Sequence, residues 1–463
     1  MGKDNYGYLP EERPTTGKLF LYALQQVIVM FPATITVALI TGFQVSTTIF
    51  ASGLATLCFI FITGKKIPLY YGSSFAYLSA VASMAYAEGT AEQIASWEST
   101  KILPTELVSK AQFGIIMSGF VSIAAGLLVR KFGKDTIEKI LPASITGPIS
   151  MIIGLTLAKN ALSDAVPAKA GANTNAWLVV SLVTLLSTIL YSKYLKGFLG
   201  QIPLLLGAVT GSACAGLFYL IGGSDYNLFR SIPDAALNSL WSAGPFAVPA
   251  FSLPKFSLTS LLAIMPIAIA TIPESTAHMY QLDIYVNDVA KKKGKKLGYS
   301  LIDMLDKNLI GDGLCDMISG FVGGPAGTNY GENISTMAIT KVFSVPVLMV
   351  ASVIAMIVSC FTPLIKAIYG IPLAVIGGLE VYLFGAIAAQ GIAIMIDKKV
   401  DMFSSKNIAV IASIMVIGVG GQYVFEGNIP FFGMNIPCVA GASIFGIALN
   451  ALLSIGENKE ENN

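Results

Sequence analysis

The chain has 463 residues, of which 54% are hydrophobic and only 12% are charged. A soluble domain carries about twice that charged fraction, so the composition excludes an ordinary soluble enzyme and predicts a polytopic membrane protein. The net charge of +2 points to no nucleic-acid partner. Residues 1–18 are polar and contain no apolar run, so we expect no cleavable signal peptide.

Apolar runs of about 20 residues are long enough to cross a bilayer, and the chain contains many of them. In chain order, the clear candidates are residues 19–40, 47–63, 111–129, 140–157, 176–190, 199–221, 258–271, 345–365, 371–396, 408–424 and 437–455. Three further pieces are too short or too polar for ordinary spans, namely residues 73–87, 309–322 and 332–342. The sequence therefore predicts about fourteen membrane segments.

The distribution of basic residues supports an even number of spans. With the N-terminus inside the cell and the loops alternating, the predicted cytoplasmic loops include residues 65–66, 130–134, 193–196, 291–296 and 398–399. Roughly 22 of the 29 Lys and Arg residues then lie inside, as the positive-inside rule requires. We therefore predict a multi-pass protein of the cytoplasmic membrane with both termini in the cytoplasm.

Two stretches interrupt the apolar pattern with polar and turn-forming residues. The stronger one is Thr328-Asn329-Tyr330-Gly331-Glu332-Asn333-Ile334-Ser335, which follows Gly323-Gly324-Pro325-Ala326-Gly327. A weaker copy is Tyr71-Gly72-Ser73-Ser74-Phe75-Ala76. Transporters build their substrate sites from paired discontinuous helices near the middle of the membrane. We therefore predict that the two stretches form facing walls of one binding site.

A second internal similarity relates residues 141–148 to residues 371–378, and each of these stretches opens a long span. The two related pairs have similar offsets, near half the chain length. Seven spans in each half is an odd number, so the halves would have opposite orientations, which is the inverted-repeat plan of secondary transporters. Chance recurrence of Gly and Pro is the alternative, and two pairs in the same order disfavour it.

One acid and the only histidine of the chain are placed to share a helix face. His278 lies four residues after Glu274, which is the spacing of one helical turn. A carboxylate and an imidazole on one face next to hydrocarbon form a natural proton site. A structural hydrogen bond is an equal alternative for His278, whereas the expense of keeping an acid in the membrane favours a functional role for Glu274.

Other acids occur within or beside the predicted spans. Glu332 lies in the stronger interruption, where it could bind a ligand or stabilise the first turn of a helix. Glu380 lies in a long span, and nothing in the sequence identifies a partner for it. We expect Asp312 and Asp316, which lie in a short segment containing glycines, to cap a helix or to pair with Lys307.

Aromatic side chains accompany both interruptions, namely Tyr71, Phe75 and Tyr330. A ring at such a position can stack on a planar ligand. Packing in the protein core is the commoner role of an aromatic side chain. The sequence leaves both roles open.

We find none of the motifs that mark soluble enzymes: no GxGxxG opening a βαβ unit, no Walker A sequence, no HExxH and no Ser-His-Asp set. One histidine cannot supply a multi-histidine metal site. The five cysteines are scattered through apolar stretches without a CxxC motif, so we interpret them as small buried hydrophobes. We predict no catalytic residue, no metal and no cofactor, with the proton as coupling ion.

The chain resembles the nucleobase–ascorbate transporter family, and within it the bacterial uracil permease branch. The similar stretches run nearly the whole length of the chain: Leu24-Gln25-Gln26, Met30-Phe31-Pro32-Ala33-Thr34, Lys66-Ile67-Pro68, Gly72-Ser73-Ser74-Phe75-Ala76, Pro273-Glu274-Ser275-Thr276-Ala277-His278 and Asp316-Met317-Ile318-Ser319-Gly320-Phe321. The most specific stretch leads on to residues 328–334, where the Tyr-Gly-Glu-Asn form is similar to the uracil branch. The purine and ascorbate branches tend to carry a Gln-Glu-Phe-Gly type of motif.

The resemblance implies an all-α polytopic membrane protein of about fourteen transmembrane segments in two inverted seven-span repeats. Short strands and half helices are expected in the third and tenth segments. The resemblance also implies a core domain, formed by residues 1–135 and 256–363, and a gate domain, formed by residues 136–255 and 364–463.

The resemblance further implies roles for individual residues. Glu274 and Glu332 would accept hydrogen bonds from the ring N–H groups of uracil. Main-chain groups of Phe75 and Gly331 would meet the carbonyl oxygens and the ring edge, while the Phe75 ring and Tyr330 would pack on the base. The predicted substrate-binding residues are Ser74, Phe75, Glu274, Tyr330, Gly331 and Glu332. The predicted proton-coupling residues are Glu274, His278 and Glu332.

The leading interpretation is a proton-coupled symporter that imports uracil, or a closely related nucleobase, by alternating access. Its expected partners are the nucleobase, the proton, membrane lipids and a second copy of the chain bound through the gate domain, with no nucleic acid. The alternatives are a transporter of the same fold for xanthine, another purine or an anion, a channel, and an intramembrane enzyme. Dispersed acids disfavour an enzyme that binds metal and diphosphate, and acids at the interruptions disfavour an anion transporter.

Three positions depart from the pattern of the family. Gln26 stands where the family often has a histidine. Phe384 stands where a tyrosine is expected, which removes one hydroxyl group. Ser335 stands where a glycine is expected. Together with the additional acid Glu380, these departures bear on the choice of substrate and on coupling.

Overall fold

The computed structural model describes residues 7–135, 140–166, 173–229, 244–432 and 434–455, and it is mostly helical. Within these residues, nine helical stretches are long and apolar enough to cross a membrane. They are α1 (Thr16–Thr41), α2 (Val45–Ile62), α5 (Thr105–Phe132), α7 with α8 (Ala143–Thr156 and Ala158–Ala165), α9 (Thr174–Tyr194), α10 (Pro203–Gly222), α11 with α12 (Leu258–Ile264 and Ala268–Lys292), α17 (Leu373–Asp397) and α18 (Ser405–Phe425). Such a set of helices is characteristic of an integral membrane protein.

Shorter elements complete the described fold. The helices are α3 (Leu78–Glu88), α4 (Ala91–Thr100), α13 (Leu305–Val322), α14 (Gly331–Thr340), α15 (Val345–Ser359), α16 (Thr362–Tyr369) and α19 (Cys438–Leu453). The strands are β1 (Tyr71–Ser73), β2 (Gly327–Asn329), β3 (Asn428–Phe431) and β4 (Met434–Pro437). The strands form two separate two-stranded sheets, β1 with β2 and β3 with β4.

Two predicted spans have different limits in the structure. The span predicted to end at residue 271 continues through α12 to Lys292, so Glu274 and His278 lie inside a helix. The predicted end of this span was wrong because hydropathy indicates which residues contact lipid. A helix that is partly buried in protein can carry polar residues and continue beyond the apolar run. The span predicted for residues 345–365 ends at Ser359, and the separate helix α16 follows it.

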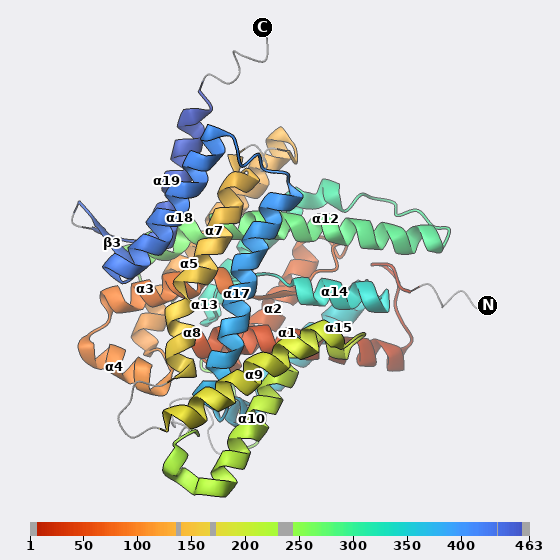
Figure 1. Cartoon of the computed structure of the whole chain (residues 1–463). Coiled ribbons are helices and arrows are strands. Elements are labelled where there is room, and N and C mark those ends of the chain that lie inside the picture. The colour runs from red at the N-terminus through yellow and green to blue at the C-terminus, as the bar shows by residue number, and fades with distance from the viewer. Residues whose placement is uncertain (1–6, 136–139, 167–172, 230–243, 433, 456–463) are drawn as a thin grey trace.

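The membrane helices pack in two groups (Figure 1). In the first group, α13 packs on α2 and α5, α15 packs on α1 and α2, and α11 packs on α5. In the second group, α17 packs on α7, α8 and α9, while α18 packs on α7 and α19, and α10 on α9. In Figure 1, α17 crosses the centre of the view in blue, and α18 and α19 run together at the upper left.

The two interruptions of the apolar pattern pair with each other as strands. Strand β1 pairs with β2 in antiparallel orientation, with Gly72 opposite Thr328. Two hydrogen bonds extend the pairing beyond the strands, from the Ser74 N–H to the Ala326 carbonyl (3.0 Å) and from the Tyr330 N–H to the Tyr70 carbonyl (2.9 Å). Each strand is followed by a short helix, α3 or α14. The backbone N–H and carbonyl groups of each non-helical stretch therefore form hydrogen bonds with the corresponding stretch from the other half of the chain.

The N-terminal segment is fastened to the ends of α12, α14 and α15. The N–H of Phe343 donates to the Tyr8 carbonyl at 2.8 Å. Lys293 and Lys295 donate to the carboxylate of Glu12 at 2.5 and 2.7 Å. Partial burial of Glu12 opposes its ionisation, but the hydrogen bonds from the two lysines outweigh this effect and lower its pKa from 4.5 to about 2.

We expect Glu12→Gln to loosen this segment. Because the pKa of Glu12 is lowered in the folded state, its stabilisation is present above pH 4.5 and is lost as the pH falls towards about 2. At neutral pH, the amide of Phe343 should exchange roughly two- to fivefold faster in the variant, as measured by hydrogen–deuterium exchange. The neighbouring exposed carboxylate supplies the control Glu11→Gln, which should leave exchange unchanged. Equal protection of Phe343 in wild type and Glu12→Gln would contradict a stabilising ion pair.

Candidate functional site

A cavity of about 280 Å³ lies where the paired strands meet α7, α12 and α17. It therefore has walls from both groups of helices. Its polar lining residues are Ser73, Ser74, Thr146, Ser150, Glu274, His278, Thr328, Asn329, Tyr330, Glu332 and Gln390. Its other lining residues are Phe75, Ala76, Ile153, Ala270, Pro273, Gly331, Leu383, Ala386, Ile387 and Ile394. A wall that combines polar and apolar residues, around a volume at the small end of ligand sites, suits a small molecule with both polar and apolar groups.

All the residues predicted to bind substrate or protons line this one cavity. They are Ser74, Phe75, Glu274, His278, Tyr330, Gly331 and Glu332. The first two follow β1, the last three follow β2, and the remaining pair comes from α12. The structure thus brings together residues from three distant parts of the chain, while their roles in binding and in proton transfer stay predictions.

The two acids of the site come from different elements and are both half-buried. Glu274 lies in the middle of α12, and Glu332 lies in the first turn of α14. The amino end of α14 carries unpaired N–H groups and a partial positive charge, which stabilises a carboxylate there. The cavity therefore offers two hydrogen-bond acceptors next to backbone donors. Among the described residues, no group of three His, Cys, Asp or Glu side chains is placed to hold a metal ion.

His278 packs against the first turn of α14. A Cβ atom at Gly331 would lie 3.0 Å from Nε2 of His278, so the glycine leaves room for the ring. The imidazole is 8% exposed, and its Nδ1 has no hydrogen-bond partner within the described residues. His278 therefore lines the cavity and also packs between α12 and α14. This position is compatible with both roles suggested by the sequence, a proton site with Glu274 and a structural contact.

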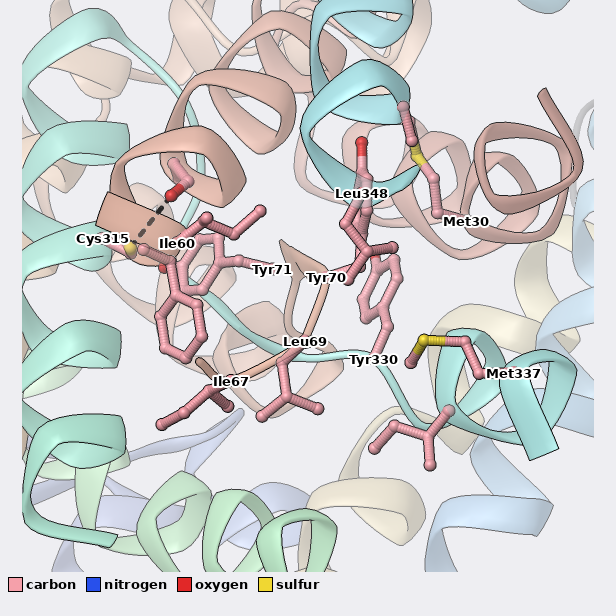
Figure 2. Packing of buried hydrophobic residues seen from close by; sticks show 14 of the residues in the cluster. Met30, Ile60, Ile67, Leu69, Tyr70, Tyr71, Cys315, Tyr330, Met337 and Leu348 are labelled. Carbon is pink, nitrogen blue, oxygen red and sulfur yellow. Dashed lines mark hydrogen bonds between the residues drawn. The ribbon is translucent and has the colours of Figure 1, made fainter. Parts of the chain in front are cut away.

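Tyr330 is held mainly by the protein core. Its hydroxyl group donates to the Ser73 carbonyl (3.1 Å) and lies 2.9 Å from Oγ1 of Thr34. Figure 2 shows its ring next to Tyr70 and Met337 in a cluster of buried side chains. The ring is 3% exposed. Of the two roles left open by the sequence, packing describes the Tyr330 ring in this structure.

A buried polar network lies behind β2 and was not predicted. Nδ2 of Asn329 donates to Ser275 Oγ (3.0 Å), Asn308 Oδ1 (3.1 Å) and Asp312 Oδ2 (3.2 Å). Ser275 adjoins Glu274 in α12, so this network fixes β2 against the helix that carries the first acid. Buried polar groups need such partners because leaving them unpaired is costly.

The expectation for Asp312 and Asp316 was wrong. Both side chains are buried in α13 instead of pairing with Lys307. Asp316 accepts hydrogen bonds from the Gly327 N–H (2.8 Å) and from the hydroxyl group of Tyr71. It therefore joins the end of β2 to β1. The sequence showed polar residues among glycines in this segment, but the partners come from distant strands and could not be read from local spacing.

Six polar lining residues were missed, although a signal for some of them existed: Ser73, Thr146, Ser150, Thr328, Asn329 and Gln390. Gln390 is a polar residue within an apolar span, which usually indicates a functional position. Thr146 and Ser150 are four residues apart and so share one face of α7. Ser73 lies within the interruption itself. Which face of α7 and α17 meets the cavity was decided only by packing.

The three departures from the family pattern lie outside the cavity lining. Gln26 is buried, and its side-chain oxygen accepts from Asn333 Nδ2 at 2.8 Å, which ties α14 to α1. Phe384 is buried in an apolar cluster beside the cavity. Ser335 is exposed on the outer face of α14. None of the three therefore changes a side chain that faces the cavity.

Comparison with known proteins decides the family. A match to the Permease family extends over residues 17–427. The chain belongs to this family. It is similar to a uracil permease of Bacillus caldolyticus, with 33% identity over 448 residues that cover 96% of this chain and 94% of the relative. It is also similar to a uracil permease of Escherichia coli strain K12, with 32% identity over 96% of this chain and 93% of the relative.

Family membership confirms the resemblance seen in the sequence motifs, and it identifies an integral membrane transporter and not an enzyme. Two solved structures share the fold. The murine anion transporter Slc26a9 in the inward-facing state gives a TM-score of 0.65 at 14% identity, covering 96% of this chain and 69% of that one. The transmembrane domain of the cyanobacterial bicarbonate transporter BicA gives 0.59 at 16% identity, covering 89% and 98%.

We expect Gly72→Ala to disrupt the pairing of the two strands. A Cβ atom at Gly72 would overlap the ring of Tyr330, which the surrounding core and two hydroxyl contacts hold in place. Overpacking of this kind costs about 1–3 kcal/mol, so the thermal unfolding midpoint of the purified protein should fall. Gly385→Ala is the matched control, because nothing lies near a Cβ atom there. An unfolding midpoint equal to that of the control would mean that the ring can move aside.

Proposed function

We propose that the protein imports uracil, or a closely related nucleobase, together with protons across the cytoplasmic membrane. The observation that carries this proposal is the cavity that Glu274, Glu332 and Phe75 line together at the amino end of α14. Uracil presents two ring N–H donors, two carbonyl acceptors and flat apolar faces. The carboxylates match the donors, the backbone N–H groups match the acceptors, and the aromatic ring suits the flat face.

The names of the relatives support the same substrate, since both compared proteins are uracil permeases. The two solved structures carry transporters of anions, but at 14% and 16% identity they share only the fold. Two acids in the cavity would repel an anion unless both were protonated. A neutral nucleobase is therefore the better substrate on electrostatic grounds.

We further propose about fourteen spans arranged as two inverted repeats. The packing supports this arrangement, because corresponding helices of the two halves make corresponding contacts. The contact of α2 with α15 matches that of α13 with α5, and the contact of α1 with α15 matches that of α11 with α5. In the other group, α9 with α10 matches α18 with α19, and α9 with α17 matches α18 with α7. The pairing of β1 with β2 relates the two halves to each other.

In this proposal, the first group of helices is the core domain (residues 1–135 and 256–363) and the second is the gate domain (136–255 and 364–463). The core supplies the strands and both acids, while the gate supplies α7 and α17. A site between two separately packed groups can be opened to either side by moving one group against the other, which is alternating access. A homodimer formed through the gate domain stays a prediction.

Proton coupling is proposed from the placement of Glu274 and His278 one turn apart on α12. A neutral imidazole donates from one nitrogen and accepts at the other, which suits a proton relay beside a carboxylate. The positive-inside rule places the loop with residues 291–296 in the cytoplasm. With an even number of spans, both chain termini then lie in the cytoplasm as well. The termini themselves lie outside the described residues.

Uptake of radiolabelled uracil into proteoliposomes tests the function. We expect accumulation when the exterior is acidic, loss of accumulation with a protonophore, and no need for sodium. Competition by unlabelled uracil, xanthine and bicarbonate identifies the substrate class. Uptake that survives the protonophore but requires sodium would overturn proton coupling, and competition by bicarbonate alone would replace the nucleobase by an anion.

Glu332→Gln should abolish high-affinity binding. A carboxylate accepts two hydrogen bonds without presenting a donor, whereas an amide places a donor towards the ring N–H. The loss of a charge-assisted hydrogen bond should cost about 1.5–3 kcal/mol, or roughly 10- to 150-fold in affinity measured by calorimetry. Glu92→Gln on the exposed face of α4 is the control and should bind normally. Wild-type affinity in Glu332→Gln would remove this residue from the site.

A further inference from the structure

Glu380 is a buried acid that the proposed transport mechanism does not use. It lies in the first half of α17 and is 1% exposed. Neither of its carboxylate oxygens has a hydrogen-bond partner within the described residues. An isolated carboxylate is very costly to bury, whereas a neutral carboxyl group is far less so. Burial without a hydrogen-bond partner therefore favours the neutral form of Glu380 in this conformation.

An apolar plug separates Glu380 from the substrate cavity. The plug is a cluster of buried side chains from both groups of helices. Its members are Val37 of α1, Leu78 of α3, Leu157 just before α8, Ala161 of α8, and Leu383 and Phe384 of α17. Leu383 and, farther along α17, Gln390 also line the cavity. Glu380 precedes the plug residues of α17 by one turn, so it lies on the side of the plug away from Gln390.

An ion pair joins the two groups of helices at the same end. Nζ of Lys101 lies 2.9 Å from Oδ1 of Asp164, and both side chains are partly buried. Lys101 follows α4, and its loop is tied to the end of α1 by a hydrogen bond of 2.8 Å from the Leu103 N–H to the Gly42 carbonyl. Asp164 lies in α8, which packs on α17. The pair therefore bridges the proposed core and gate.

These two residues are the charged groups that face Glu380. Helix α8 approaches α17 so closely that a Cβ atom at Gly377, one turn before Glu380, would overlap the backbone at Ala165. The other helices packed here present neutral groups: Gly154 of α7 to Phe384, Ser181 and Thr184 of α9 to Gly378, and Gly207 of α10 to Leu379. Lys101 is the cation whose charge acts on Glu380, and it is already paired with Asp164.

We propose that Glu380 is a second proton-binding site, which locks this end of the transport pathway. The carboxyl group is protonated while the plug is packed and the ion pair is closed. When the two groups of helices separate, water reaches Glu380, its O–H bond breaks, and the proton leaves on water as hydronium. Water then solvates the carboxylate, because Lys101 moves with the core away from both Asp164 and Glu380. This inference rests on the alternating access of the proposed function, and it adds a proton site in the gate to those in the core.

The sign of the pH effect follows from the site. The closed state holds one more proton than the open state, so acid favours closure and alkali favours opening. For one proton, the ratio of closed to open molecules changes by at most about tenfold for each pH unit. This dependence needs no substrate, which separates it from proton coupling at Glu274 and His278.

Spin labels on both sides of the ion pair can measure closure in the full chain. Ser99 of α4 and Ser163 of α8 are exposed and flank Lys101 and Asp164. The labels are attached to cysteines at these two positions, in a background without the five native cysteines that retains uracil uptake. Pulsed electron resonance on protein in lipid nanodiscs without uracil then gives the distance distribution. We expect a short and a long population, and the short one should increase from pH about 8 to about 5.

Variants of Glu380 decide whether this residue is the proton site. Glu380→Gln mimics the protonated acid, so it should hold the short population at every pH. Glu380→Asp keeps a titratable carboxyl group and should retain the pH response. Tyr382→Phe is the matched control, because the Tyr382 hydroxyl group contacts Ser192 of α9 and its loss should change nothing at Glu380. A normal pH response in Glu380→Gln would overturn the proposal.

The same measurement separates failure of this inference from failure of the proposed function. Two populations whose ratio does not depend on pH in the wild type would overturn the proton lock and leave alternating access intact. A single population under all conditions, with and without uracil, would count against movement at this end and so against both. If the wild type takes up uracil actively but its ratio of short to long distances does not depend on pH, only the proposed role of Glu380 is wrong.

Discussion

The fold depends on hydrogen bonds to the backbone N–H and carbonyl groups at the two places where membrane segments are not helical. In hydrocarbon, each unpaired N–H or carbonyl group costs several kcal/mol, so a lone interruption would be unstable. Here, the interruption after Tyr70 pairs with the one after Ala326, and each supplies the partners that the other lacks. This pairing joins the two halves of the chain and aims the starts of two short helices at the same cavity. The close fit of Tyr330 over Gly72 then holds the strands in register.

The buried and half-buried acids of the protein differ in what their carboxyl groups face. Asp316 accepts two hydrogen bonds and serves the structure by joining the strands to α13. Glu274 and Glu332 instead face the cavity, where a ligand can supply what the protein does not. Among the residues that the structure describes, Glu380 has no hydrogen-bond partner, and it does not line the cavity. The difference is physical, because an acid without a protein partner must hold a proton, bind a ligand or be hydrated.

In the proposed alternating access, the position of the cavity between two groups of helices would connect binding with movement. A ligand that touches both groups binds differently when their relative position changes, and this difference in affinity is what a transporter needs. The apolar plug and the ion pair between Lys101 and Asp164 lie at one end of the same boundary. In the proposed alternating access, the contacts at this boundary would be the ones that change.

The sequence by itself determined the membrane class and most of the helices of membrane length, and the residues that it predicted for the site line one cavity. Apolar runs of membrane length have few alternatives, and polar residues such as Glu274 and Glu332 inside such runs are rare enough to stand out. Only the tertiary structure decided the partners. Asp316 meets Tyr71 across a large part of the chain, and Lys101 meets Asp164 across the boundary between the helix groups. Such contacts could not be predicted because local spacing reports which face of a helix a residue occupies, whereas long-range packing decides what lies against that face.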